Sequence, residues 1–399
     1  FVACDKKGQQ DTELQNLTQY VDPYIGTGDH GHVFMGANVP FGLVQLGPTN
    51  ITEGWDWVSG YHISDSTIWG FTHMHLNGTG IGDLCDIAFM PVVGDVKLGK
   101  GVISDKESGM YSLFSHDKET AKAGHYTVHL DRYDIDVEVA ATKRVGFHKY
   151  TFPESADAKV VIDLKSKINW DEPTETYLVY ENDSTISGYR YSKGWANDQR
   201  VFFTATFSKP MKKFLLSETE DPKKAKEDKE LKAVGVYGQA LFDMKDKEEL
   251  YIKVALSPVS IDNAKFNMLA ELPGWDFNQT IADANKAWNE ELNKIQIKVA
   301  DDKVKRTFYT ALYHTMIAPS EFFDVNGDYR GADAQMHKKG TFNNYTTFSL
   351  WDAYRAAHPL MTIIHPEKMS DIINTMLTIY QEQGKLPVWH LVGCETDCM

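Results

Sequence analysis

The chain has 399 residues, a formal charge of −15 and 42% hydrophobic residues. This length is too great for one ordinary hydrophobic core, so we expect two domains. The negative charge disfavours a nucleic-acid partner, because a polyanion would be repelled. No run of about eighteen apolar residues occurs, so we expect no membrane-spanning segment.

The first residues, FVACDKK, resemble the end of a bacterial lipoprotein signal, in which a cysteine after small apolar residues is lipidated. We therefore expect residues 1–14 to be a signal remnant and tether, with Cys4 as the lipidation site. A bacterial cell-envelope lipoprotein, periplasmic or on the surface, would follow; an ordinary N-terminal tail is the alternative. The other cysteines are too few for a disulfide framework, and Cys394 and Cys398 could close a small loop or stay free.

Residues 20–48 are rich in glycine, and residues 26–31 match the pattern G-x-G-x-x-G. That pattern marks a dinucleotide site only between a strand and a helix. Here Pro23 precedes it, and Gly36, Pro40 and Gly42 follow it, so we reject a nucleotide site. Glycines at this density indicate tight turns or a backbone that approaches a ligand closely.

Two His-x-His pairs lie nearby, His30 with His32 and His73 with His75. Alternate residues of a strand share a face, so each pair could chelate a metal such as zinc. Loop histidines held by hydrogen bonds are the alternative, and we favour it.

Residues 94–258 show short alternating runs that are typical of strands, among them Tyr126, Val128 and Leu130, then Ile135, Val137 and Val139. Many short strands without intervening helices predict a β-sandwich over residues 15–258. The charged run 221–232 is interpreted as a solvated hairpin tip.

After Pro258 the period becomes helical. We expect a helical linker over residues 259–300 and then helices separated only by loops, such as 322–347. One helix is well marked: Pro366 suits its first position, Gly384 its stop, and an apolar stripe lies between them. The stripe contains Met369, Ile372, Ile373, Met376, Leu377 and Tyr380.

Clusters of a different kind flank this helix. Trp351, Asp352 and Arg355 precede it, and Trp389, His390 and Glu395 follow it. An aromatic face with carboxylates and a guanidinium suits a sugar, which stacks on the ring and hydrogen-bonds through its hydroxyls. The alternative is structural, with Asp352 and Arg355 as an ion pair at three-residue spacing and Trp351 in the core.

Four long segments resemble glycoside hydrolase family 92, a family of calcium-dependent exo-acting α-mannosidases. The similarity extends from about Tyr20 to the last residue. The segments are VDPYIGTGDHGHVFMGANVPFGLVQLGPTN, GWDWVSGYHISDSTIWGFTHMHLNGTG, SLWDAYRAAHPL and GKLPVWHLVGCETDCM.

The resemblance implies an N-terminal β-sandwich joined by the linker to an (α/α)6 barrel, of which residues 301–399 would be the first part. Ten to twelve helices need roughly two to three hundred residues, so we expect a longer polypeptide. The implied activity is inverting, Ca²⁺-dependent hydrolysis of terminal α-linked mannose, with α-1,2 linkages of N-glycans or yeast mannan as targets. An α-mannoside glycan is the one partner expected.

Site residues follow from the same resemblance. The G-W-D segment assigns sugar contacts to Trp55 and Asp56; an aromatic turn packed on the sheet is the alternative for Trp55. Asp352 is the first choice for accepting hydrogen bonds from sugar hydroxyls, with Trp351 beside it and Arg355 as a sugar contact or a support for Asp352. Glu395 is a candidate carboxylate near the reaction centre; a helix N-terminal carboxylate is the alternative.

The family's catalytic acid, base and calcium segment match nothing up to Met399, so we assign no catalytic or metal-binding residue to this chain. Two other functions stay open. One is a non-catalytic glycan-binding lipoprotein, which would bind mannosides and release nothing. The other is a glycoside phosphorylase, which would require phosphate.

Overall fold

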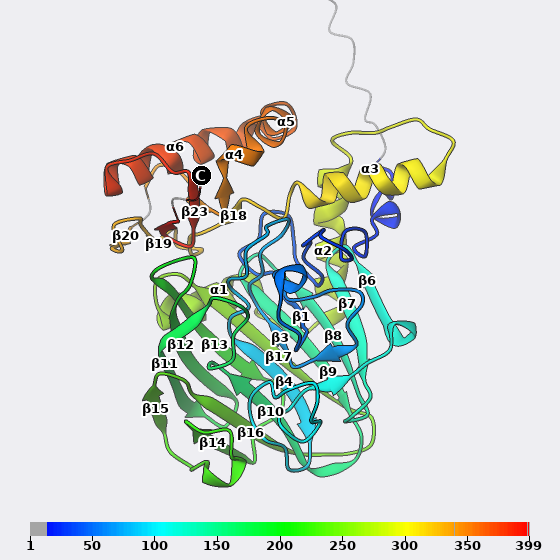
Figure 1. The fold of residues 1–399 in the computed structure, drawn as a ribbon, viewed down its shortest axis with the longest axis vertical. Coiled ribbons are helices and arrows are strands. Elements are labelled where there is room, and N and C mark those ends of the chain that lie inside the picture. Colours follow the sequence, from blue (N-terminus) through cyan, green and yellow to red (C-terminus); the bar gives the residue numbers. More distant parts are fainter. Residues whose placement is uncertain (1–13, 339, 397, 399) are drawn as a thin grey trace, which may run out of the picture.

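The computed structural model describes residues 14–338, 340–396 and 398, which form a β-sheet region followed by a mainly helical region (Figure 1). The expected lipidation site, Cys4, lies outside the described residues. The last long strand ends at Ser257 and the first α-helix begins at Ile261. Within the described part, no helix combines the length and the apolar character that crossing a bilayer requires.

Two antiparallel sheets form the N-terminal region. Among the described residues, the smaller sheet has the order β1 (Gly47–Thr49), β3 (Gly70–Thr72), β4 (Ala88–Val93), β10 (Ser155–Asp163), β16 (Tyr237–Met244), β14 (Lys213–Ser217). The larger, again counted over the described chain, has the order β15 (Glu230–Ala233), β11 (Glu172–Asn182), β12 (Thr185–Lys193), β13 (Gln199–Phe207), β17 (Glu248–Ser257), β9 (Val145–Phe152), β8 (Ile135–Ala141), β7 (His125–Leu130), β6 (Glu119–Lys122). The strand pair β2 (Thr67–Ile68) and β5 (Ser112–Leu113) lies outside both sheets.

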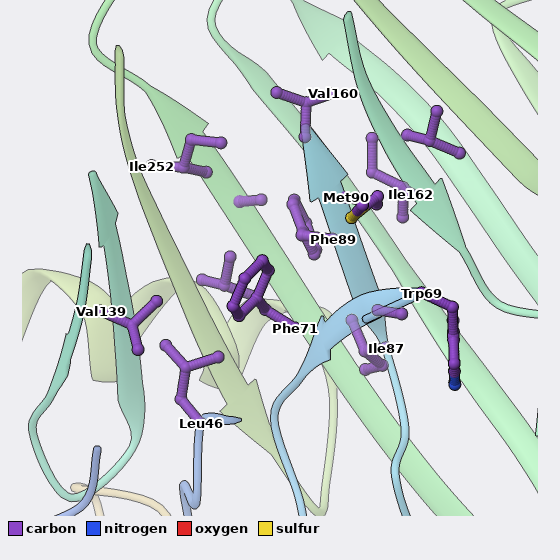
Figure 2. Close-up of a cluster of buried hydrophobic side chains, with 14 of the residues drawn as sticks. Leu46, Trp69, Phe71, Ile87, Phe89, Met90, Val139, Val160, Ile162 and Ile252 are labelled. Atoms are coloured by element: carbon purple, nitrogen blue, oxygen red, sulfur yellow. The ribbon is translucent and has the colours of Figure 1, made fainter. Parts of the chain in front are cut away.

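The sandwich forms because alternate side chains of its strands are apolar. In β7 and β8 the predicted residues point inward, and Tyr126, Val128 and Ile135 are all buried. They join one core with side chains of the smaller sheet, such as Phe71 and Phe89 (Figure 2). Apolar inner faces and more polar outer faces are what two packed sheets require.

The charged run 221–232 is solvated as predicted, but it is not a hairpin tip. It begins with a 3-10 turn, η4 (Pro222–Lys224), and continues into β15, which pairs with β11. The preceding strand, β14, pairs with β16 in the other sheet. The segment therefore crosses from one sheet to the other, an arrangement that charge content alone does not reveal. The remaining 3-10 turns are η1 (Thr18–Tyr20), η2 (Trp55–Trp57) and η3 (His116–Lys118).

Helices α1 (Ile261–Glu271) and α2 (Phe277–Leu292) follow the sandwich and pack on its larger sheet, α1 against β17 and β13 and α2 against β8. Each begins at a capping side chain: Ser260 accepts a hydrogen bond from Asn263 N, and Asp276 accepts one from Gln279 N. Trp288 of α2 is fully buried, and its indole nitrogen donates to the carbonyl of Asn38 at 2.8 Å.

The rest of the chain is not made of helices alone, contrary to the sequence-based expectation. Between α3 (Asp302–His314) and residue 396 there are short strands that no periodicity announces, because each is only two or three residues long. They are β18 (Ser320–Glu321) with β21 (Tyr345–Thr346), β19 (Tyr329–Arg330) with β20 (Met336–His337), and a sheet of β22 (Phe348–Ser349), β23 (Trp389–Leu391) and β24 (Cys394–Glu395). The helices among them are α4 (Leu350–Ala353), α5 (Ala357–Ile364) and α6 (Pro366–Gln383).

Helix α6 confirms the predicted boundaries. Pro366 is its first residue, and Gly384 caps it in the left-handed conformation at φ 81°. The apolar stripe is divided in its packing, because Ile372 is buried whereas Ile373 and Leu377 are about half exposed. The helix therefore uses a narrower face against the described core than its sequence predicts.

One buried guanidinium joins the sandwich, the first helix and the helical region. Arg144, in the turn between β8 and β9, bonds Glu271 of α1 at 2.7 Å and Glu321 of β18 at 2.9 Å. Its Nε donates to the carbonyl of Phe323 at 2.6 Å. Both carboxylates are also largely buried, with 15% and 5% of their side chains exposed.

We expect Arg144→Met to lower the free energy of unfolding by on the order of 3–5 kcal/mol, because Glu271 loses its cation and Glu321 keeps only Lys143, whose side chain is 47% exposed. Urea or thermal denaturation measures this loss. Arg306→Met is the control, since that side chain is 53% exposed and lies 3.4 Å from Asp22. It should cost less than about 1 kcal/mol. Equal effects of the two substitutions would contradict a central role for Arg144.

Candidate functional site

A cleft of about 920 Å³ lies between the sandwich and the helical region. The sandwich contributes Trp55, residues 77–81 and Trp195. The opposite wall comes from the end of α3, from residues 347–361 and from Trp389, and includes His314, Ser349, Trp351, Asp352 and His358. Neither region alone forms this cleft.

Aromatic side chains give the cleft its character. Trp55 and Trp351 remain 56% and 45% exposed. Trp195 and Trp389, one from each wall, are in contact with ring centroids 4.3 Å apart. Exposing the apolar face of an indole ring to water is unfavourable. Such exposed faces are typical of sites where the ring stacks on the apolar face of a ligand.

The position of Trp55 is fixed by its surroundings. Its indole nitrogen donates to the carbonyl of Gly80 at 3.0 Å, and the ring of His32 packs edge-on at 4.5 Å. A Cβ on residue 80 would lie 3.1 Å from the indole nitrogen, so glycine permits this close approach. The indole ring of Trp55 is therefore held at one edge while much of the side chain stays exposed. It is not packed on the sheet, as the alternative prediction required.

Asp352 is the one carboxylate that lines the cleft among the described residues. It lies in α4 and accepts a hydrogen bond of 2.5 Å from the hydroxyl of Ser349. This contact uses one carboxylate oxygen and orients the group.

His314 also lines the cleft, although no sequence motif indicates it. Burial lowers the pKa of His314 to about 4, so its imidazole is neutral at pH 7. Its Nε2 is buried without a protein hydrogen-bond partner among the described residues. The last position of a helix carries no motif, so only the fold reveals this residue.

Matches to known families fit this geometry. Residues 20–257 match the glycosyl hydrolase family 92 N-terminal domain, and residues 263–399 match the glycosyl hydrolase family 92 catalytic domain. This chain belongs to glycosyl hydrolase family 92.

Solved structures of this family have the same fold. A family GH92 α-mannosidase from Bacteroides thetaiotaomicron in complex with mannoimidazole superposes with a TM-score of 0.92 at 39% identity, covering 96% of this chain and 51% of that one. The family GH92 inverting mannosidase of Bacteroides thetaiotaomicron VPI-5482 gives 0.83 at 26% identity, covering 96% and 51%.

A curated relative, an uncharacterized secreted glycosidase of Arthroderma benhamiae, is 24% identical over 95% of this chain and 47% of its own length. This family 92 chain therefore spans about half the length of the relatives that it matches.

The structure separates the six predicted site residues. Trp55, Trp351 and Asp352 line the cleft together, whereas Asp56, Arg355 and Glu395 are not among its lining residues in the described chain. Asp56 lies 2.6 Å from the Nδ1 of His30, next to Trp55 in the same 3-10 turn. It supports the neighbouring loop in this conformation.

The alternative ion pair between Asp352 and Arg355 is wrong for the residues that the structure describes, because Arg355 donates to the hydroxyl of Tyr354 at 3.2 Å instead. The four-residue helix α4 ends at Ala353, so the regular three-residue spacing does not continue to Arg355. Arg355 is exposed beside the cleft and does not support Asp352 directly.

Glu395 does not cap a helix, which corrects the alternative prediction for this residue. It lies in β24, and its two oxygens accept hydrogen bonds of 2.9 Å from the backbone nitrogens of Trp389 and Val388. These bonds hold Trp389, and therefore the aromatic wall, in place.

Three of the four paired histidines, His30, His73 and His75, form hydrogen bonds as predicted, whereas the Nε2 of His32 is buried without a hydrogen-bond partner among the described residues. His73 bonds the carbonyl of Ile87 through Nδ1 at 2.6 Å and His148 through Nε2 at 2.9 Å. His75 bonds the carbonyl of Gln45 at 2.8 Å. Burial lowers the pKa of His73 to about 3 and that of His75 to about 4, so both rings stay neutral.

Two further features bear on the site. Cys394 and Cys398 are free thiols in the structure, which resolves the alternative that the sequence left open. A second cavity, of about 440 Å³, lies between α2 and the end of β8. None of its described lining residues is aromatic, so it lacks a stacking surface for a sugar.

We expect Glu395→Gln to lower the free energy of unfolding by about 1–3 kcal/mol, because an amide has one acceptor oxygen and leaves one of the two backbone donors unsatisfied. Thermal denaturation measures the change. The control is Glu367→Gln, whose side chain is 58% exposed and which should have little effect. Unchanged stability combined with lost mannoside binding would place Glu395 in the site instead.

Proposed function

We propose that this chain forms the substrate-binding part of an exo-acting α-mannosidase that removes terminal non-reducing α-linked mannose from glycans. The observation that carries the proposal is the aromatic cleft with Asp352 in a chain of glycosyl hydrolase family 92. Relatives of known structure include α-mannosidases, one of them in complex with mannoimidazole.

The cleft offers each kind of contact that a hexose needs. The faces of Trp55 and Trp351 suit the apolar face of a sugar ring. Asp352 accepts hydrogen bonds from hydroxyls, and a charged acceptor makes such bonds stronger than neutral ones.

We further propose inversion of configuration and a preference for α-1,2 linkages, as the family resemblance implies. An inverting glycosidase uses two carboxyl groups roughly 6.5–9.5 Å apart, one as acid and one as base. The described cleft contains one, Asp352, which we assign to substrate binding. The acid and the base are expected outside the described residues.

Calcium is proposed as the cofactor on the same grounds. Ca²⁺ takes six to eight oxygen ligands. The one described group of His, Cys, Asp and Glu with metal-ligand spacing contains a histidine nitrogen, Asp333–His337–Glu382, and it does not fit Ca²⁺. We therefore expect the calcium ligands in other segments and derive no step through the ion.

A second candidate function is glycan binding without hydrolysis, since the described cleft has a single carboxylate. It would use the same stacking surface and the same acceptor. Release of mannose separates the two functions.

Asp352→Ala should lower kcat/KM for mannoside hydrolysis by at least about tenfold in the active enzyme, which corresponds to roughly 1.4 kcal/mol of transition-state binding. Initial rates of mannose release provide the measurement. Asp302→Ala is a matched control, because that carboxylate is 75% exposed on α3 and lies outside the cleft. An unchanged kcat/KM for the Asp352 variant would remove this residue from the site.

Mannose release from an α-1,2-linked mannobiose should occur with calcium, stop with EDTA and return when calcium is added back. Chromatographic quantification of free mannose measures it. Release that persists in EDTA would contradict the calcium requirement. Binding of the disaccharide with no release under either condition would favour the glycan-binding function.

A further inference from the structure

We propose that Asp333, His337 and Glu382 form a binding site for one transition-metal dication such as Zn²⁺. Asp333 and His337 belong to the β19–β20 hairpin, and Glu382 lies in the last turn of α6. A metal bound there would fasten the hairpin to the helix. None of these residues lines the described cleft, so this proposal stands apart from the mannosidase activity.

The three side chains converge as metal ligands do. Their ligand atoms all lie within 4.8 Å of one another. The Nε2 of His337 is 3.0 Å from Asp333 Oδ1 and 3.5 Å from Glu382 Oε1. Ligands about 2.1 Å from a tetrahedral ion are separated by roughly 3.4 Å, so both separations suit a shared metal.

Gly331 supplies an independent observation. A Cβ on this residue would lie 2.7 Å from Asp333 Oδ1, from Glu382 Oε1 and from His337 Nε2. Its φ is outside the range that favours glycine, so the backbone conformation does not require glycine at this position. A side chain at this position would therefore crowd all three ligand atoms, and glycine lets them approach the backbone this closely.

Neighbouring groups orient the ligands. The ring of Tyr329 stacks on His337 with centroids 5.1 Å apart, and its hydroxyl donates to Glu382 Oε1 at 3.3 Å. The backbone nitrogen of Ala332 donates to Glu382 Oε2 at 2.7 Å. Such outer contacts fix ligand geometry in established metal sites.

The charges also favour a cation. Two carboxylates meet one imidazole nitrogen, which carries at most one proton and cannot satisfy both fully. The described ion pairs of Asp333 and Glu382 involve only His337. A dication neutralises both carboxylates and takes the imidazole as a neutral ligand. The competing arrangement is an imidazolium bridging two carboxylates, which needs no metal.

The mixed donor set selects the metal. One imidazole nitrogen and two carboxylate oxygens suit Zn²⁺ or a similar transition metal, with water as a fourth ligand, whereas Ca²⁺ and Mg²⁺ prefer oxygen alone. Glu382 is buried, with 8% of its side chain exposed, and Asp333 and His337 are about 30% exposed. A hydrated ion can therefore reach the site from the hairpin side.

Zinc binding by the untagged protein after removal of bound metals tests the proposal, with elemental analysis after dialysis as the readout. The wild type should retain one equivalent of Zn²⁺, and His337→Gln and Glu382→Gln should lose it, because each removes a ligand. Gly331→Ala should lose it as well while all three ligands remain. Excess Ca²⁺ should not displace the zinc.

His129→Gln is the matched control. That histidine also lies between carboxylates, but they are divided between its two nitrogens, with Asp136 2.7 Å from Nδ1 and Asp134 3.5 Å from Nε2. This variant should keep the equivalent of zinc. Asp333→Asn provides a further variant if another fails to fold by circular dichroism. A wild type without a bound equivalent, or a His337 variant that retains it, would overturn the proposal.

Discussion

The buried guanidinium of Arg144 is the contact on which the arrangement of the two regions depends. It binds Glu271 of the first helix and Glu321 of the helical region. A buried charge is tolerated only when it is paired and hydrogen-bonded, so all three partners must be in place together. The contact therefore specifies one relative position for the sandwich, α1 and β18, beyond what apolar packing alone selects.

The cleft depends on that position because its walls come from different regions. Trp195 lies on the sandwich side and Trp389 on the other, and the two rings are in contact. A second ion pair also joins the two regions: Arg330 of β19 bonds Asp198 of the sandwich at 2.7 Å. A rotation of one region against the other would separate the indoles from Asp352. The residues that bind sugar in our proposal are thus positioned by ion pairs outside the cleft.

The sequence predicted the elements that have a regular pattern of apolar residues or clear end signals. Alternation identified β7 and β8, and Pro366 with Gly384 marked the ends of α6. It missed the strand that holds Glu395, since two residues show no period. It also missed His314. The pairing of Arg144 with Glu271 and Glu321 could not be predicted either, because these partners are 127 and 177 positions away in the sequence and long-range contacts have no local signal. Within the candidate site, the family motifs located Trp55, Trp351 and Asp352. They did not show which of the six candidate residues line the same cleft.

A structure of the protein with mannoimidazole, determined in the presence of calcium, would show whether the cleft at Asp352 binds the sugar. The ligand should lie in the cleft between the sandwich and the helical region, with its ring against the exposed indoles of Trp55 or Trp351. A hydroxyl should lie within hydrogen-bonding distance of the Asp352 carboxylate. Ligand bound elsewhere, or bound in the cleft without contact to Asp352, would contradict the proposed sugar site.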